Sequence, residues 1–341
     1  MSRAYLDFNA TAPLRPEARD AMLEASVLIG NPSSVHAEGR AAKAAVERAR
    51  AQVAEAVGCQ TPEVVFTSGA TEAASVLAHI PGTISVEETA HDAVWAHRRD
   101  ATGPVTRAIG VANSETGLVA EDASKGSADV LMLDATQAIG RIPWAFSWSG
   151  ADLAILSAHK LGGPKGIGAL IVRRGFDVPA LQVGGGQEMG RRSGTENIAA
   201  IAGFGAAAKA AMADLENGTW DRVAELRNIL ETRLAETARD AIFVGAGAKR
   251  LPNTSCVIVP GWKGETQVMQ MDLAGYAISS GSACSSGKVR ESRVLRALGF
   301  DDAAASSAIR ISMGPQTTKD EIMGFAAAWS HQYEKFRARA A

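Results

Sequence analysis

The chain has 341 residues, enough for one large domain and a smaller one. Hydrophobic residues make up 46% of it and charged residues 21%, a globular composition that excludes a disordered or fibrous protein. The formal net charge of -2 gives no electrostatic argument for a nucleic-acid or acidic-membrane partner. No secretory signal and no run of eighteen apolar residues is visible, so we expect a soluble protein.

The first part of the chain predicts helices alternating with buried strands. Apolar residues spaced by four indicate an amphipathic helix over 35–57, which Gly58 ends. Short apolar runs predict the strands 63–67, 83–86, 105–111, 129–134, 153–157 and 167–172. A further helix is expected over 92–99. This alternation is typical of an α/β domain with a mostly parallel sheet.

The second part has a different character. A glycine-rich segment opens at Gly184, and helices are expected over 196–216 and 219–240. Shorter strands, expected at 256–259, 276–279 and 309–312, are mixed with further helices and indicate a smaller α+β domain. We therefore expect a large domain over 12–244 and a small one formed by 1–11 and 245–341.

Cysteine usage points to a reducing compartment. Cys59, Cys256 and Cys284 are odd in number and show no CxxC spacing, which argues against a disulfide framework and a zinc site. The six histidines contain no HExxH pattern, so no metal site is predicted. We expect a cytoplasmic protein.

Two side chains at strand ends suggest a cofactor. Lys160 follows the strand 153–157 among glycines, where an open α/β sheet places ligands, and a lysine there can form a Schiff base with an aldehyde. Asp134 ends the strand 129–134. Pyridoxal phosphate needs this pair: a lysine for its aldehyde and a carboxylate for its pyridinium nitrogen. The alternative for Lys160 alone is a solvated loop lysine.

Two further segments fit the same cofactor. The loop Ser68–Thr71, followed by a helix, can hold a phosphate, although a plain strand-to-helix turn is the alternative. His91 opens a helix where its ring can stack on a flat heteroaromatic ring, and a surface or capping histidine is the alternative.

Two residues of the second part suggest the reaction. Cys284 lies in a run of small residues, 279–287, which suits an exposed thiol nucleophile, and an inert surface thiol is the alternative. Arg310 is a charged residue within an apolar strand. Its planar guanidinium suits a substrate carboxylate, and a buried salt bridge is the alternative.

These residues lie in motifs that resemble those of NifS/IscS-type cysteine desulfurases, in the class V branch of fold-type I pyridoxal-phosphate enzymes. The motifs run in family order from Tyr5 to Ser312: YLDFNATAPL, GNPSSVHAEGR, VVFTSGATEA, ETAHDAV, ANSETG, DATQAIGRIP, SAHKLGGPKGIGAL, GGGQEMGRRSGTEN, SSGSACSSG, VLRALG and SAIRIS. They cover nearly the whole chain.

The resemblance implies a role for each matching residue. Lys160 would carry the pyridoxal 5'-phosphate and shuttle protons, and Cys284 would take sulfur from L-cysteine as a persulfide, leaving alanine. His91, which would also be catalytic, would stack on the ring, with Asp134 at the pyridine nitrogen and Gln137 at the phenolic oxygen. The other expected cofactor contacts are Ala70, Thr71, Ser157, His159, Ser114 and, from the neighbouring subunit of a homodimer, Thr195. Arg310 and Asn31 would bind the substrate carboxylate.

The chain departs from the family pattern at two places. Ser114 replaces the second asparagine of Asn-Asn-Glu-x-Gly, and the stretch between His91 and Asn113 is short. The leading hypothesis is a cysteine desulfurase that feeds an iron–sulfur scaffold or another sulfur acceptor. The alternatives are a related lyase or aminotransferase, for example a selenocysteine lyase, and a weakly active binding subunit.

Overall fold

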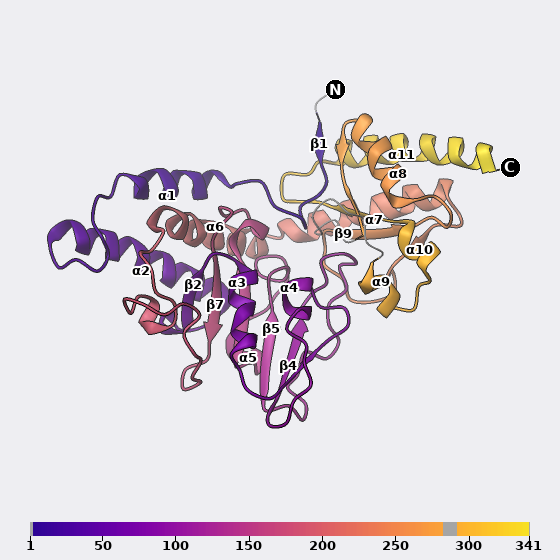
Figure 1. The fold of residues 1–341 in the computed structure, drawn as a ribbon. Helices are drawn as coiled ribbons and strands as arrows, with labels where there is room; N and C mark the ends of the chain where they lie inside the picture. The colour runs from indigo at the N-terminus through magenta and orange to yellow at the C-terminus, as the bar shows by residue number, and fades with distance from the viewer. Residues whose placement is uncertain (1–2, 282–291, 341) are drawn as a thin grey trace. The chain divides into compact units, whose positions relative to one another are not determined.

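The computed structural model describes residues 3–281 and 292–340. The chain forms two compact units (Figure 1). One comprises Thr11–Ala112 and Ala120–Glu216, and the other Met1–Ala10, Asn113–Val119 and Asn217–Ala341. The division falls after Glu216 rather than after residue 244, so the helix that begins at Thr219 groups with the carboxy-terminal residues.

The first unit contains a six-stranded sheet in the order β2-β7-β6-β5-β4-β3. Its strands are β2 (Val64–Thr67), β3 (Thr83–Val86), β4 (Val105–Gly110), β5 (Val130–Asp134), β6 (Leu153–Ser157) and β7 (Gly168–Val172). The pairs from β3 to β6 are parallel, whereas β7 is antiparallel to both of its neighbours. The predicted mostly parallel α/β sheet is confirmed.

Both faces of this sheet are buried, as continuous apolar strands require. Val64 and Phe66 belong to the core on one face, whereas Val65 belongs to the core on the other face. The helices of this unit are α1 (Pro16–Ser26), α2 (Ala37–Val57), α3 (Ala70–Ala74), α4 (Asp92–Trp95), α5 (Phe146–Ser149) and α6 (Ile198–Glu216). Short 3-10 helices are η1 (Thr61–Glu63), η2 (Ser75–Ala78), η3 (Ala158–Lys160) and η4 (Glu188–Gly190).

The helices α1, α2 and α6 lie side by side (Figure 1). Small residues on α6 allow this close packing: a Cβ on Gly203 would lie 2.5 Å from Met22 Cγ, and one on Gly205 would lie 2.7 Å from the Cα of Ala49. By length and composition α6 could cross a membrane, but Ile201 and Phe204 are 1% exposed and belong to the core. We therefore read α6 as a core helix.

The second unit is a smaller α+β arrangement, as predicted. Its four-stranded sheet has the order β11-β12-β9-β8, and β1 pairs separately with β10. The strands are β1 (Ala4–Tyr5), β8 (Ile242–Phe243), β9 (Thr254–Ile258), β10 (Tyr276–Ala277), β11 (Ser279–Ser280) and β12 (Ala308–Ser312). The helices are α7 (Thr219–Thr237), α8 (Gly264–Leu273), α9 (Arg293–Ala297), α10 (Asp302–Ser306) and α11 (Lys319–Ala340).

The helix expected over 92–99 is shorter than predicted. It ends at Trp95, and Arg99 turns its guanidinium to the carbonyls of Leu77, Ile80 and Gly82 instead. The backbone of Arg99 also pairs with that of Ile84 in β3 as an antiparallel bridge, which a helix continued through Arg99 would not allow.

Candidate functional site

Several predicted site residues lie at one edge of the six-stranded sheet. The register pairs Thr67 of β2 with Gly168 of β7, and Gly168 with Ser157 of β6. Asp134 ends the next strand, β5, opposite Ile155. The carboxyl ends of β2, β6 and β5 therefore meet at this edge, where an open α/β sheet binds its ligands.

The loop Ser68–Thr71 approaches the ends of β6 and β7 closely because Gly69 of the loop and Gly168 of β7 lack side chains. A Cβ on Gly168 would be 2.4 Å from the Leu156 carbonyl oxygen and 2.7 Å from the Cα of Gly69. A Cβ on Gly69 would meet only Ser157 Oγ, at 3.9 Å. A methyl group on Gly69 would therefore just contact the Ser157 hydroxyl, and Ala70 and Thr71 lie in the first turn of α3.

The carboxylate of Glu72 fixes this loop from the helix side. It accepts a hydrogen bond from the Ser68 N–H at 2.7 Å and pairs with Arg192 at 2.9 Å. Burial raises the pKa of Glu72, but the hydrogen bonds from Arg192 and Ser68 outweigh it and lower the pKa overall. Glu72 therefore connects the loop Ser68–Thr71 with the glycine-rich segment 184–195.

A second group of polar residues follows β5. Asp134 Oδ1 accepts from the Thr136 N–H at 2.9 Å, which orients the carboxylate. Gln137 is buried, and its Oε1 accepts from Arg141 Nη1 at 2.5 Å. Since the carbonyl end of this amide faces the guanidinium, its Nε2 end is directed away from Arg141 as a donor.

Lys160 and His159 lie on η3, directly after β6. The Lys160 carbonyl accepts from Arg141 Nη2 at 2.7 Å, so a single guanidinium holds both Gln137 and the backbone of Lys160. His159 Nδ1 lies 3.2 Å from Thr11 Oγ1. Burial, together with the positive charges of Lys160, Lys165 and Arg141, lowers the pKa of His159 to about 4. The imidazole is therefore neutral at physiological pH.

His91 follows β3 and is the N-cap of α4. Its Nδ1 accepts from the Ala93 N–H at 3.1 Å, and the side chain is exposed. The capping role weighed in the sequence analysis is thus present. It fixes the ring at the start of the helix.

Thr195 and Asn31 are both exposed and lie in segments without regular structure. Asn31 Oδ1 accepts from the Ser33 N–H at 2.9 Å, which makes a local turn. No described contact joins either residue to the sheet edge that carries Asp134, Ser157 and Lys160.

Arg310 and Ser114 belong to the second unit. Arg310 lies in β12, is 3% exposed, and pairs with Asp7 at 2.6 Å. Its Nη1 donates to the Ser114 carbonyl at 3.1 Å. Ser114 thus contacts Arg310 through its backbone carbonyl, so this contact does not depend on whether the side chain at position 114 is serine or asparagine. The salt-bridge alternative for Arg310 is therefore present, with one nitrogen, Nε, buried and without a hydrogen-bond partner among the described residues.

The described cysteines are poor nucleophiles. Burial raises the pKa of Cys59 to about 12, with Glu63 adding to it, and burial with Glu115 raises that of Cys256 to about 12. Cys284, the predicted nucleophile, lies outside the described residues.

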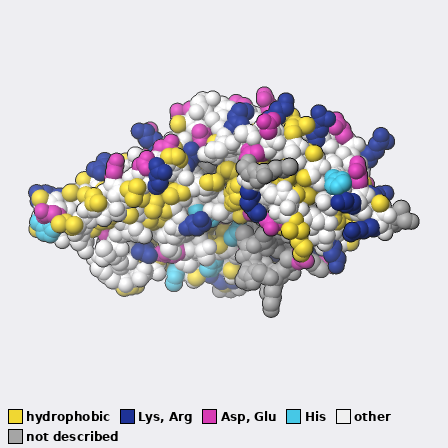
Figure 2. Space-filling view, turned by 90° about the horizontal axis from the view of Figure 1, so that it is seen from above, with side chains coloured by type: hydrophobic (Ala, Val, Ile, Leu, Met, Phe, Trp, Pro, Cys, Tyr) yellow, Lys and Arg dark blue, Asp and Glu magenta, His cyan; other side chains and the backbone are white. Residues whose placement is uncertain are grey.

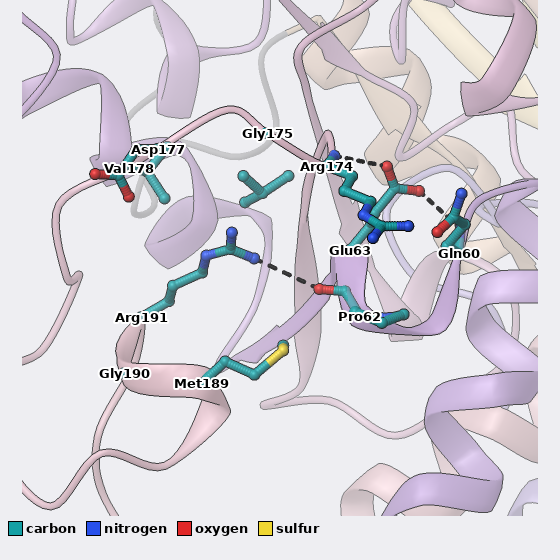
Figure 3. Close-up of a pocket in the computed structure, with 11 residues that line it drawn as sticks. Gln60, Pro62, Glu63, Arg174, Gly175, Asp177, Val178, Met189, Gly190 and Arg191 are labelled. Carbon is teal, nitrogen blue, oxygen red and sulfur yellow. Dashed lines mark hydrogen bonds between the residues drawn. The ribbon is translucent and has the colours of Figure 1, made fainter.

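A pocket of about 580 Å³ lies elsewhere in the first unit (Figure 3). It is lined by η1, the carboxyl end of β7 and Met189–Arg191. Because β7 is antiparallel to β6, this end lies at the edge opposite Ser157. Both Glu63 carboxylate oxygens accept backbone N–H groups, those of Gln60 and Arg174, so this acid has a structural role.

Sequence reasoning missed Arg141, Thr11 and Asp7. Arg141 stands four residues after Gln137, a one-turn spacing that could have indicated the contact. Thr11 and Asp7 contact residues 148 and 303 positions away, which no local pattern reveals.

Comparison with known proteins adds a family signal to this geometry. The Aminotransferase class-V family model matches residues 4–94 and 101–325. A "Cysteine desulfurase" of Cereibacter sphaeroides is 39% identical over 94% of this chain and 93% of its own length. A "Cysteine desulfurase IscS" of Dictyoglomus turgidum is 34% identical over 93% of this chain and 91% of its own.

Solved structures agree in fold. A NifS-like protein from Rickettsia africae superposes with a TM-score of 0.89 at 29% identity, covering 97% of this chain and 99% of that one. A second NifS-like protein gives a TM-score of 0.87, also at 29% identity, over 97% and 99% of the two chains.

Proposed function

The chain belongs to the class-V aminotransferase family, and we propose that it is a cysteine desulfurase that takes sulfur from L-cysteine onto Cys284. The observation that carries the proposal is the sheet edge of the first unit, where Asp134, Ser157 and Lys160 follow neighbouring strands. The named relatives, several of them cysteine desulfurases, support the substrate.

The residues at this edge fit pyridoxal 5'-phosphate. The loop at Gly69 and the Ser157 hydroxyl would hold the phosphate, with Thr71 and the neutral His159 as further polar groups. Asp134 would hold the pyridinium nitrogen, and the amide nitrogen of Gln137 would donate to the phenolic oxygen. When bound, the cofactor supplies an electron sink for the carbon atoms of the amino acid.

The protein residues have distinct tasks in this scheme. The Lys160 amine would hold the cofactor aldehyde and then move protons to and from the substrate carbon. The ring of His91 would stack on the cofactor from the start of α4. Because Arg141 holds both Gln137 and the Lys160 carbonyl, it positions two of these groups together.

Sulfur transfer needs a nucleophilic thiol. The Cys284 sulfur would attack the substrate sulfur, forming an S–S bond as the substrate C–S bond breaks. The thiol of Cys284 becomes a persulfide, the substrate becomes L-alanine, and the electron pair of the C–S bond takes up a proton. The raised pKa values of Cys59 and Cys256 support the assignment to Cys284.

Arg310, with Asn31, would bind the substrate carboxylate. Arginine presents a planar fork of N–H donors that matches a carboxylate. The buried Arg310 Nε, which lacks a hydrogen-bond partner among the described residues, is a donor suited to such a ligand.

We also infer a homodimer in which Thr195 contacts the cofactor phosphate of the neighbouring subunit. In support, five large apolar side chains of the first unit are 46–89% exposed: Leu14, Leu23, Val27, Ile29 and Val35. Figure 2 shows hydrophobic side chains gathered over this part of the molecule. We further infer a cytoplasmic enzyme that passes its sulfur to an iron–sulfur scaffold or another acceptor protein.

The test is product formation from L-cysteine by the purified protein loaded with pyridoxal 5'-phosphate. We expect L-alanine and sulfide in equal amounts when a thiol reductant is present. Lys160→Ala should abolish both products. Alanine production from L-selenocysteine alone would favour a selenocysteine lyase instead, and pyruvate as the product would favour another lyase.

A further inference from the structure

Asp7 forms a partly buried link between two neighbouring strands of the second unit. Its Oδ1 pairs with Arg310 Nη2 at 2.6 Å, and its Oδ2 accepts from Ser279 Oγ at 2.8 Å. Ser279 of β11 lies directly opposite Arg310 of β12 in the antiparallel register. Directly opposite residues project from the same face of a sheet, so one carboxylate can span both.

The backbone holds a second nitrogen of the guanidinium. Arg310 Nη1 donates to the Ser114 carbonyl, which also accepts from Asn9 Nδ2 at 3.0 Å. Asn9 is fully buried and donates in addition to Thr254 Oγ1 at 2.9 Å. Two of the three guanidinium nitrogens are therefore fixed by groups that are themselves anchored.

The third nitrogen, Nε, is different. It is buried, yet no described residue accepts its N–H. Buried donors nearly always have partners, and one without a partner is a candidate for binding a ligand. The fixed orientation of the other two nitrogens decides where this donor points.

We propose that Asp7 is a positioning residue that orients Arg310 for the substrate carboxylate, and so makes the site selective for substrates that retain this carboxylate. The proposal rests on the function proposed above, in which Arg310 binds that group. Asp7 would act through its contacts with Arg310 and Ser279.

The physical reason lies in the geometry that a guanidinium requires. Its hydrogen bonds to a carboxylate are directional, so a rotated side chain loses them. A buried arginine without its counter-ion is also unfavourable and tends to leave its position. The opposite possibility is that Asp7 competes with the substrate for Arg310, in which case its removal would tighten substrate binding.

The experiment compares Asp7→Asn with the wild-type holoenzyme. We expect KM for L-cysteine to rise about tenfold, as expected for a lost charge-assisted contact, with kcat changed by less than about twofold. Binding of the product L-alanine, measured by calorimetry, should weaken by the same factor. Binding of ethylamine, which is L-alanine without its carboxylate, should not change. Asp7→Glu should restore part of the preference for L-alanine.

Arg310→Gln separates this inference from the proposed function. If Arg310→Gln leaves the preference for L-alanine over ethylamine intact, Arg310 does not bind the carboxylate and its proposed role fails. If Arg310→Gln removes the preference but Asp7→Asn preserves it, or tightens L-alanine binding, only the positioning role of Asp7 is refuted.

A milder variant covers the case in which Asp7→Asn does not fold. Ser279→Ala removes only the hydrogen bond to Asp7 Oδ2, and we expect KM for L-cysteine to rise about threefold. In the Arg310→Gln background the same change should have no further effect on the preference for L-alanine, because both act through one guanidinium. Additive effects on that preference would contradict the proposal.

Discussion

At the scale of single residues, burial sets the chemistry of several titratable side chains. Cys59 and Cys256 sit in apolar surroundings that raise their pKa values, whereas His159 is kept neutral beside three cations. Burial therefore makes the two thiols inert. Burial together with the neighbouring positive charges keeps a neutral imidazole beside Lys160.

The cysteines differ in predicted reactivity. A pKa of about 12 leaves Cys59 and Cys256 with roughly a thousand times less thiolate than an ordinary thiol at neutral pH. Brief treatment of the native protein with iodoacetamide should therefore label Cys284 and spare the other two, as read by peptide mass spectrometry. All three should react in denaturant. Labelling of Cys59 or Cys256 at the rate of Cys284 would refute this difference.

His159 predicts a pH dependence of stability. The unfolded chain binds a proton at this residue near pH 6.5, whereas the folded protein does so only near 4. Between these values the unfolded state holds more protons, so the folded state loses stability as the pH falls from about 6.5 to about 4. His159→Gln cannot bind this proton, so the stability advantage of the wild type over this variant should shrink across that window in urea titrations. A constant difference would contradict the shift.

At the scale of elements, a buried ion pair fastens the segment 184–195 to β2. Arg50 of α2 makes two hydrogen bonds to Glu188, at 2.6 and 2.8 Å, and its guanidinium lies over the Phe66 ring. Glu188 also accepts from the Phe66 N–H at 2.8 Å. Glu188 and Met189 adopt left-handed backbone conformations, with φ of 50° and 58°, which these contacts must compensate.

Breaking this pair on one side should be costly. Glu188→Gln leaves Arg50 buried with only Glu47, at 3.2 Å, as its counter-ion, and we expect a loss of about 3 kcal/mol in the free energy of unfolding. Because the double variant Arg50→Met with Glu188→Gln removes this incompletely neutralised cation, it should be more stable than Glu188→Gln alone. Urea denaturation of both variants and the wild type measures this. Glu188→Gln with wild-type stability would show that the pair does not hold the segment.

The sequence predicted these elements unevenly, for physical reasons. The regular alanine spacing of α2 and the apolar runs of the strands carry strong periodic signals, and Gly58 does end α2 with a positive φ of 67°. The helix α1 carries little signal, because only Ala18 and Ala25 of its residues are buried while Leu23 is 62% exposed. The antiparallel direction of β7 depends on its connection to β6 and is not written in its composition.

The candidate site divides in the same way. Asp134, Ser157 and Lys160 could be placed at strand ends from the apolar runs that precede them, and the structure brings them to one sheet edge. The residues that orient them could not be found so easily. Arg141 and Asp7 act through tertiary contacts that depend on the completed fold.

At the scale of the whole molecule, the exposed apolar residues between Leu14 and Val35 predict a subunit interface. Val27→Glu and Ile29→Glu place charges at sites that are 75% and 89% exposed, so they should leave each subunit folded. We expect them together to weaken the dimer at least about tenfold, because a buried unpaired charge is strongly unfavourable. Light scattering across a concentration series measures this.

The matched control is Leu273→Glu, at an apolar residue of α8 that is 83% exposed. It should leave the dimer intact. Equal dissociation by both changes, or none by Val27→Glu with Ile29→Glu, would place the interface elsewhere.

The central claim is that Cys284 receives the sulfur of L-cysteine, and a single turnover without reductant tests it most directly. The holoenzyme is mixed with one equivalent of L-cysteine per subunit, and alanine and the mass of the Cys284 peptide are measured together. We predict one alanine per subunit and a mass increase of one sulfur atom on that peptide, with neither product from Cys284→Ser. Alanine release by Cys284→Ser at the wild-type rate, or sulfur found on Cys59 or Cys256 instead, would contradict the claim.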